Sequence, residues 1–282
     1  MKNKGSGKYL FKYYKKETDL FLEHLDKAKY FPDEKNIHQL RVDIKRIRTV
    51  FQLIEMLFPK KLKAKNQYTV FKKIFSRAGE VREAQVNHIC FTQYKLPASI
   101  YKQYFQFLKR KEKNFKKKFK NSIDRFEIGQ LEKSKVKIKR LCKSITEKKI
   151  KYECQLFIKG EIHKIEMLLA VGNNSSIVHK IRIHLKAIEA VGDLYYQLNP
   201  DKELKKSLTL IKENGTFLGN WHDKIILINS LEVFFMNTVN IKGNKLFLLN
   251  ELLNKINKEN QLFLKSFRGK IKSLFKLVKG II

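Results

Sequence analysis

The chain of 282 residues is long enough for one large domain or two of ordinary size, and 43 % of its residues are hydrophobic, including 21 Phe. This content excludes a disordered chain, although 61 Lys and Arg against 27 Asp and Glu give a net charge of +34. Such an excess repels itself in a folded protein and favours an anionic partner: nucleic acid, an anionic membrane surface or inorganic polyphosphate. No apolar run of about 18 residues occurs, so we expect no membrane insertion.

The spacing of cysteine and histidine predicts no metal or catalytic centre. Cys90, Cys142 and Cys154 form no CxxC pair, and the seven histidines form neither an HExxH nor a di-iron Glu-x-x-His motif. Clustered carboxylates for Mg²⁺ and an activated nucleophile are also missing from the pattern. We therefore expect a cytoplasmic protein with reduced cysteines that is not an enzyme and uses no metal ion or other cofactor.

Helical patterns cover most of the chain, and twelve Gly and four Pro leave few interruptions. The first predicted helices are residues 8–30, residues 34–58, a helix through Val70 and Ile89, and a long helix after Pro97. The second half repeats this order with a helix that ends near Gly172, one that ends before Pro200, one through Gly219 and Trp221, and a long helix from about residue 245. Residues 121–150 join the halves, and we expect helix and turn there rather than a free linker.

A short basic cassette occupies the second predicted helix of each half. Residues 37–48 and 178–189 carry His, Arg and Lys at the same spacing, 141 residues apart. The shared residues are His38, Arg41 and Lys45, extended by Arg48, and His179, Arg182 and Lys186. In the first copy Ile37, Leu40 and Ile44 form an apolar seam, and the cations follow one residue later, a rotation of about 100°. The cationic stripe is therefore expected to border the buried face of the helix.

Such a stripe has the chemistry of a polyanion site. It spans about 15 Å of helix, arginine binds phosphate oxygens through two N–H groups, and lysine supplies a mobile point charge. Histidine among cations is expected to stay neutral until an anion arrives, because like charges disfavour its protonated form. A solvated basic face is the alternative interpretation, and duplication at a fixed spacing favours a site.

The long fourth helix shows a similar arrangement, with aromatic residues on one side and lysines one step round. We expect Lys109, Lys113 and Lys116 to extend the binding surface. Because lysine is frequent throughout the chain, a merely soluble lysine-rich face is the alternative interpretation.

A second motif is also repeated, since residues 79–83 correspond to residues 219–223 at an offset of 140. Gly79 and Gly219 each cost about 1 kcal/mol relative to Ala in mid-helix, so we expect a close helix contact there, or else a neutral kink. We expect Glu83 and Asp223 to fix a neighbouring Arg or His rather than to act as catalytic acids.

Three matching features occur in the same order in both halves: the cassette, the proline that ends its helix (Pro59 and Pro200, again 141 residues apart) and the glycine motif. Together they indicate an internal duplication. The predicted fold is all-α, with two four-helix bundles related by a pseudo-twofold axis. We expect one domain over residues 1–282, made of halves at about 8–140 and 141–280.

The motifs together resemble the CHAD family, the conserved-histidine α-helical domain, over about residues 8–280. The resemblance rests on His-x-x-Arg-x-x-x-Lys followed by Gly-x-x-Arg-(Asp/Glu), with both motifs duplicated. It implies two pseudo-symmetric four-helix bundles that bind inorganic polyphosphate through basic residues around a central cavity. The implied contacts are His38, Arg41, Lys45, Arg48, Arg82, His179, Arg182, Lys186 and His222.

The chain departs from the family pattern mainly in its second half. Glu189 stands where the first cassette has Arg48, and His222 replaces the arginine of the second Gly-x-x-Arg motif. Glu83 replaces the commoner Asp in the first half. We therefore expect weaker binding by the second half.

The sequence thus predicts a non-enzymatic polyphosphate-binding protein of the cytoplasm, with association with polyphosphate granules as a further expectation. Two alternatives stay open. Because of its net charge of +34, the chain would bind nucleic acid non-specifically at low salt, and this could be its function. An enzyme that acts on polyphosphate is the other alternative.

Overall fold

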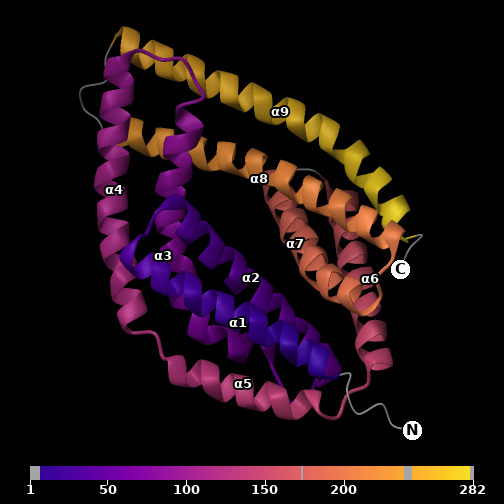
Figure 1. Cartoon of the computed structure of the whole chain (residues 1–282). Coiled ribbons are helices and arrows are strands. Elements are labelled where there is room, and N and C mark those ends of the chain that lie inside the picture. Colours follow the sequence, from indigo (N-terminus) through magenta and orange to yellow (C-terminus); the bar gives the residue numbers. More distant parts are fainter. Residues whose placement is uncertain (1–6, 173, 238–242, 280–282) are drawn as a thin grey trace.

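The computed structural model describes residues 7–172, 174–237 and 243–279, except the side chains of residues 268 and 270–279. Every element in these residues is a helix (Figure 1). The helices are α1 (Gly7–Tyr30), α2 (Glu34–Leu57), α3 (Ala64–Phe91), α4 (Ala98–Asp124), α5 (Ile128–Cys142), α6 (Glu147–Val171), α7 (Ser175–Leu198), α8 (Lys202–Asn237) and α9 (Asn244–Lys279). The all-α prediction is confirmed. None of these helices, as far as they are described, is apolar enough over a sufficient length to cross a membrane.

The two cassette helices, α2 and α7, begin and end in the same way. The side chain of Asp33 accepts a hydrogen bond from the Asn36 amide at the start of α2, and Asn174 caps α7 in the same manner. Their last turns close on Phe58 and Asn199, each of which donates its amide to the carbonyl four residues earlier. The N-cap residues Asp33 and Asn174 are 141 residues apart, and so are the C-cap residues Phe58 and Asn199, which is the same spacing as that of the cassettes. Local side-chain chemistry therefore defines two helices of 24 residues each.

Consecutive helices pack in the same order in both halves. In the first half α1 packs on α2, α2 on α3 and α3 on α4; in the second half α6, α7, α8 and α9 pair in the same sequence. The halves meet where α2 contacts α7 and α3 contacts α8. This order is compatible with two repeated halves. The duplication, its pseudo-twofold axis and its boundaries stay predictions of the sequence, and residues 1–6 and 280–282 of the predicted domain lie outside the described residues.

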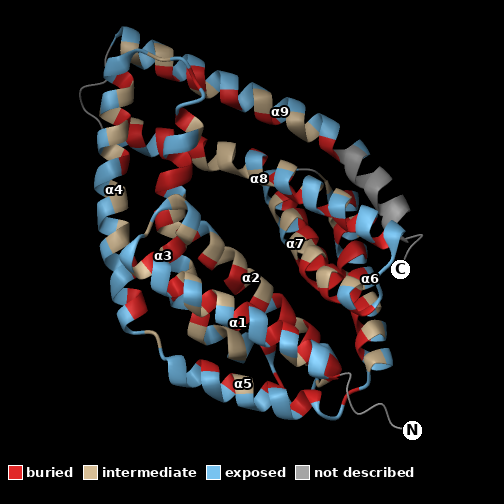
Figure 2. Cartoon of the chain, in the orientation of Figure 1, coloured by how far each residue is buried: buried red, intermediate tan, exposed pale blue. Residues whose placement is uncertain are grey.

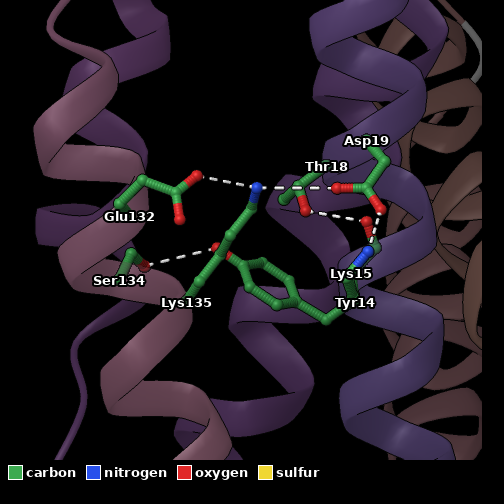
Figure 3. Close-up of polar contacts among 7 residues, drawn as sticks. All are labelled: Tyr14, Lys15, Thr18, Asp19, Glu132, Ser134 and Lys135. Atoms are coloured by element: carbon green, nitrogen blue, oxygen red, sulfur yellow. Dashed lines mark hydrogen bonds and ion pairs between the residues drawn. The ribbon is translucent and has the colours of Figure 1, made fainter.

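The join between the halves contains a packed helix, as expected. Leu131 and Ile138 of α5 are fully buried. The Tyr14 hydroxyl of α1 donates to Ser134 Oγ at 3.4 Å, and Lys135 Nζ lies 3.5 Å from Asp19 and 2.9 Å from Glu132 (Figure 3). These contacts fasten α5 to α1.

The apolar side chains form two cores. The larger one includes the predicted α2 seam, of which Ile37, Leu40 and Ile44 are fully buried. The smaller one lies between the outer parts of α3, α4, α8 and α9 and includes Tyr104 and Phe234. Exposed residues predominate on α4 and α5 at the periphery, whereas buried residues lie on the inner faces of the helices (Figure 2). The contact between α2 and α7 is therefore an interior one, and it positions the candidate site.

Candidate anion-binding site

The packing of α2 against α7 brings the two cassettes together. Lys45 of α2 is the central residue, and its pKa is lowered to about 7. Burial is the main cause, followed by the positive charges of Arg182, Arg41 and Lys186. Arg41 lies on α2 with Lys45, whereas Arg182 and Lys186 lie on α7, so both cassettes face one site. We call it the cationic cluster; it comprises His38, Arg41, Lys45, Arg82, His179, Arg182, Lys186 and His222.

Arg41 lies against Gly79 of α3. Its Nη1 donates to the Phe75 carbonyl at 2.6 Å, and its guanidinium stacks on the Phe75 ring at 4.2 Å. A Cβ at Gly79 would be 2.7 Å from Arg41 Nη1, so a larger residue there would displace this guanidinium from its present position. Burial lowers the pKa of Arg41 to about 10, and Arg41 is therefore still charged at neutral pH.

Arg182 occupies the equivalent place in the second half. Its guanidinium lies 3.8 Å from the Cβ position of Gly219 on α8, and burial again lowers its pKa. Its Nε is buried without a hydrogen-bond partner among the described residues. The close contact expected from the sequence is present at Gly79, whereas the contact at Gly219 is an ordinary one; at both positions the neighbouring group is a cassette arginine rather than another helix backbone.

The two cassette lysines differ in their partners. Lys186 lies along α8, with Cε and Nζ each 3.2 Å from the Cβ position of Gly215, and its Nζ pairs with Glu189 at 2.6 Å. Lys45 forms no ion pair with the described residues. Only the more distant charge of Asp223 opposes that of Lys45, whereas Lys186 has a directly paired acid.

Three histidines surround the arginines. The pKa values of His38, His179 and His222 are all lowered, and that of His222 falls to about 4. The rings of His179 and His222 lie 4.7 Å apart, and His179 Nδ1 is buried without a hydrogen-bond partner in the described part of the chain. The direction of these pKa shifts agrees with the expectation from the sequence. The main cause of the shifts is different from the expected one, because burial contributes more than the neighbouring cations.

The acidic residues near the cluster act as counter-ions. Arg82 donates to Glu34 of α2, which fastens α3 to the start of the first cassette helix. Asp223 is surrounded by the charges of Arg182, Arg82 and Lys45, yet burial raises its pKa. Glu83, its counterpart in the first half, instead faces Lys111. No cluster of three or more His, Cys, Asp or Glu suited to a metal ion occurs among the described residues.

Four predicted site residues lie apart from the cationic cluster. Arg48 is exposed and stacks on the Tyr68 ring at 5.1 Å, near the edge of the cluster. Lys109 and Lys113 are exposed on α4, and Lys116 pairs with Glu112 at 2.8 Å. The buried face of α4, with Tyr104 and Leu108, packs toward the smaller core, so these lysines point elsewhere. Their placement fits the alternative of a solvated lysine-rich face.

Sequence reasoning missed the surfaces that support the cations. Phe75 lies under Arg41, and Gly215 lies under Lys186. These two residues are 140 positions apart, the same offset that relates Gly79 to Gly219. The repeat spacing could therefore have identified both.

The family model of the CHAD domain matches residues 13–232, which include every residue of the cationic cluster. The chain belongs to the CHAD domain family. Its fold also resembles the crystal structure of the CHAD domain from the plant Ricinus communis, with a TM-score of 0.74. That similarity covers 95 % of this chain and 91 % of the plant chain at 10 % sequence identity. No curated protein matches the chain. The CHAD fold is thus shared with a plant protein of very different sequence.

Proposed function

We propose that this CHAD protein binds inorganic polyphosphate at the cationic cluster. The observation that carries the proposal is the excess of positive charge where α2 and α7 meet, with Lys45 at its centre. Lys45 forms no ion pair with the described residues, and Arg41, Arg182 and Lys186 all lower its pKa. Like charges repel at this distance, so a bound anion would relieve the repulsion and satisfy donors such as Arg182 Nε.

A chain of phosphates fits the cluster better than a single phosphate does. The cations come from three helices, α2, α3 and α7, of both halves, and the cassette arginines lie against Gly79 and Gly219 rather than being free to converge on one point. A flexible polyanion can place successive phosphates against successive cations. Arginine offers paired N–H groups to phosphate oxygens, and neutral histidines such as His222 can donate without adding repulsion.

We propose binding without catalysis. Asp223 lies among the charges of Arg182, Arg82 and Lys45 and serves as a counter-ion in this arrangement. The histidines of the cluster lie among cations, and their lowered pKa values keep them neutral at neutral pH. A cytoplasmic location, in association with polyphosphate granules, is part of the proposal.

Nucleic acid is the second candidate because of the net charge of +34. The exposed lysines of α4 suit such non-specific binding. The cationic cluster suits it less, because its arginines and Lys45 are half-buried between helices, where a rigid duplex cannot follow.

A competition titration tests the proposal. Long-chain polyphosphate is titrated against single- and double-stranded DNA at about 0.15 M salt, where non-specific binding to DNA is weakened. We expect polyphosphate to displace both DNAs. Equal or tighter binding of DNA would overturn the proposal.

Paired variants locate the binding energy. Arg41→Ala with Arg182→Ala should weaken polyphosphate binding by roughly 1.5–3 kcal/mol for each charged hydrogen bond lost. Lys109→Ala with Lys113→Ala removes the same charge from exposed positions and should have a much smaller effect. Thermal melting shows whether each variant is folded. If both pairs lost affinity equally, the cluster would be no more than part of a diffuse basic surface.

A further inference from the structure

We infer that Glu189 is an internal counter-ion that competes with phosphate for Lys186 and thereby gives the two halves of the cluster different roles. The inference rests on the proposed function. According to this inference, the cations of the first half can bind an anion at any time, whereas Lys186 binds the anion only after the anion has displaced Glu189.

The first observation is a reversal of charge at equivalent positions. Glu189 follows Lys186 by three residues on α7, as Arg48 follows Lys45 on α2. Because the caps of α2 and α7 are also 141 residues apart, the two positions occupy the same turn of matched helices. The second cassette therefore replaces a cation by an acid one turn from its lysine.

The second observation is the geometry of the pair. The Lys186 Nζ lies 2.6 Å from Glu189 Oε2, and the two side chains are only 33 % and 16 % exposed. The end of the lysine also rests against α8 at Gly215, with Cε and Nζ each 3.2 Å from the Cβ position. Lys186 is thus held between α8 and Glu189, whereas Lys45 forms no ion pair with the described residues and only the more distant charge of Asp223 opposes its own.

The third observation is a second cation that interacts with the Glu189 carboxylate. Arg46 of α2 also interacts with Glu189, whose charge helps to raise the pKa of Arg46. The other groups that face Arg46 are Glu17, at 3.6 Å, and Asp193 and Tyr13. A phosphate that takes Lys186 therefore leaves Glu189 within the electrostatic influence of Arg46.

Glu189→Gln tests this role, with Glu203→Gln as the matched control. Both changes remove one negative charge, but Glu203 is exposed in the first turn of α8 and forms no ion pair with the described residues. We expect Glu189→Gln to tighten polyphosphate binding about fivefold to tenfold and Glu203→Gln to tighten it by less than twofold. The slope of log affinity against log salt should steepen by about 0.7 in Glu189→Gln, because one more phosphate is neutralised without a competing acid.

A double-mutant cycle separates this role from a structural one. In a Lys186→Ala background, Glu189→Gln should gain no more than the control, since the lysine it frees is gone. Glu189→Asp, which keeps the charge, should bind like the wild type. If the wild type bound no polyphosphate, the proposed function would fail and this inference with it. If the wild type bound polyphosphate but Glu189→Gln matched Glu203→Gln, only the role of Glu189 would be overturned.

Discussion

The cassette arginines lie against glycines and form no direct ion pair with the described residues. Arg41 is fixed by the Phe75 carbonyl and ring, both of which leave its charge in place, and Gly79 provides the space for its guanidinium. Arg182 lies against Gly219 with one N–H unpaired among the described residues. A cation supported in this way is ordered before an anion binds, so little side-chain freedom is lost on binding.

Gly79→Ala and Gly219→Ala should therefore have different effects. Alanine in mid-helix favours the helix by about 1 kcal/mol, so both variants should fold. At residue 79 the new Cβ would lie 2.7 Å from Arg41 Nη1 and displace the guanidinium from the Phe75 carbonyl. We expect polyphosphate affinity to fall about tenfold, the equivalent of 1.4 kcal/mol. At residue 219 the contact is an ordinary 3.8 Å, and affinity should hardly change. Titration of both variants checks this, and equal losses would contradict it.

Binding should take up protons. In the free protein the pKa of His222 is lowered to about 4 and that of Lys45 to about 7, so their charged forms are disfavoured. The contribution of His222 to stability is present above the ordinary histidine pKa of about 6.5 and is lost as pH falls toward 4. A bound phosphate reverses the local charge, raises both pKa values and strengthens binding as pH falls.

The measurement is the polyphosphate-induced rise in melting temperature between about pH 8 and pH 6. We expect the rise to grow as pH falls in the wild type, and to grow less in His179→Gln with His222→Gln. A rise that does not depend on pH would remove the histidines from the site.

Each cassette helix is tied to the helix before it by a histidine–carboxylate pair. His24 of α1 contacts Asp43 of α2 at 2.6 Å, and Glu161 of α6 contacts His184 of α7 at the same distance. The acid lies on the cassette helix in the first half and the histidine lies there in the second. Asp43 and His184 are 141 residues apart, so the two types of side chain have exchanged places in the same type of contact. The contact therefore fixes the cassette helix in both halves.

His24→Ala should destabilise the fold. It leaves the Asp43 carboxylate, which is 2 % exposed, without its partner, and an unpaired buried polar group costs about 1–3 kcal/mol or more when charged. Urea denaturation should show this loss in the free energy of unfolding. Lys27→Ala, which breaks the exposed pair with Glu23 on the same helix, should leave the free energy of unfolding nearly unchanged. Equal effects of both changes would argue against a structural role for the buried pair.

At the level of the whole molecule, the net charge of +34 makes the anion part of the energetics of folding. Repulsion between Lys45 and the cations of α7 acts across the contact between the halves. A polyanion that bridges the cassettes would convert this repulsion into attraction and hold α2 and α7 together.

Polyphosphate should therefore raise the melting temperature strongly. At a free ligand concentration of a thousand times Kd, one site contributes about 4 kcal/mol to stability. Differential scanning calorimetry should show a large shift for the wild type and a small one for Arg41→Ala with Arg182→Ala. An equally large shift in that variant would place the stabilising contacts elsewhere on the surface.

The sequence by itself determined the helices and their limits. Pro59 and Pro200 end the cassette helices, and the seam of Ile37, Leu40 and Ile44 is fully buried as its spacing indicated. The cassettes and the glycine motif also identified the family. These features are local, because capping, proline geometry and apolar periodicity depend only on residues within a few turns.

Only the tertiary structure decided which charges meet. Lys45 faces Arg182, 137 residues away, whereas Lys109 and Lys113 point to solvent although they follow a similar pattern along their helix. The i, i+3 spacing in the sequence could have predicted the ion pair of Lys186 with Glu189. Its role in the site, however, depends on Gly215 and Arg46, which lie on other helices. Helical periodicity gives the direction of a side chain relative to its own helix. Which helix lies opposite is set by the packing of both cores, and that packing gives the same basic stripe a partner in α2 and water in α4.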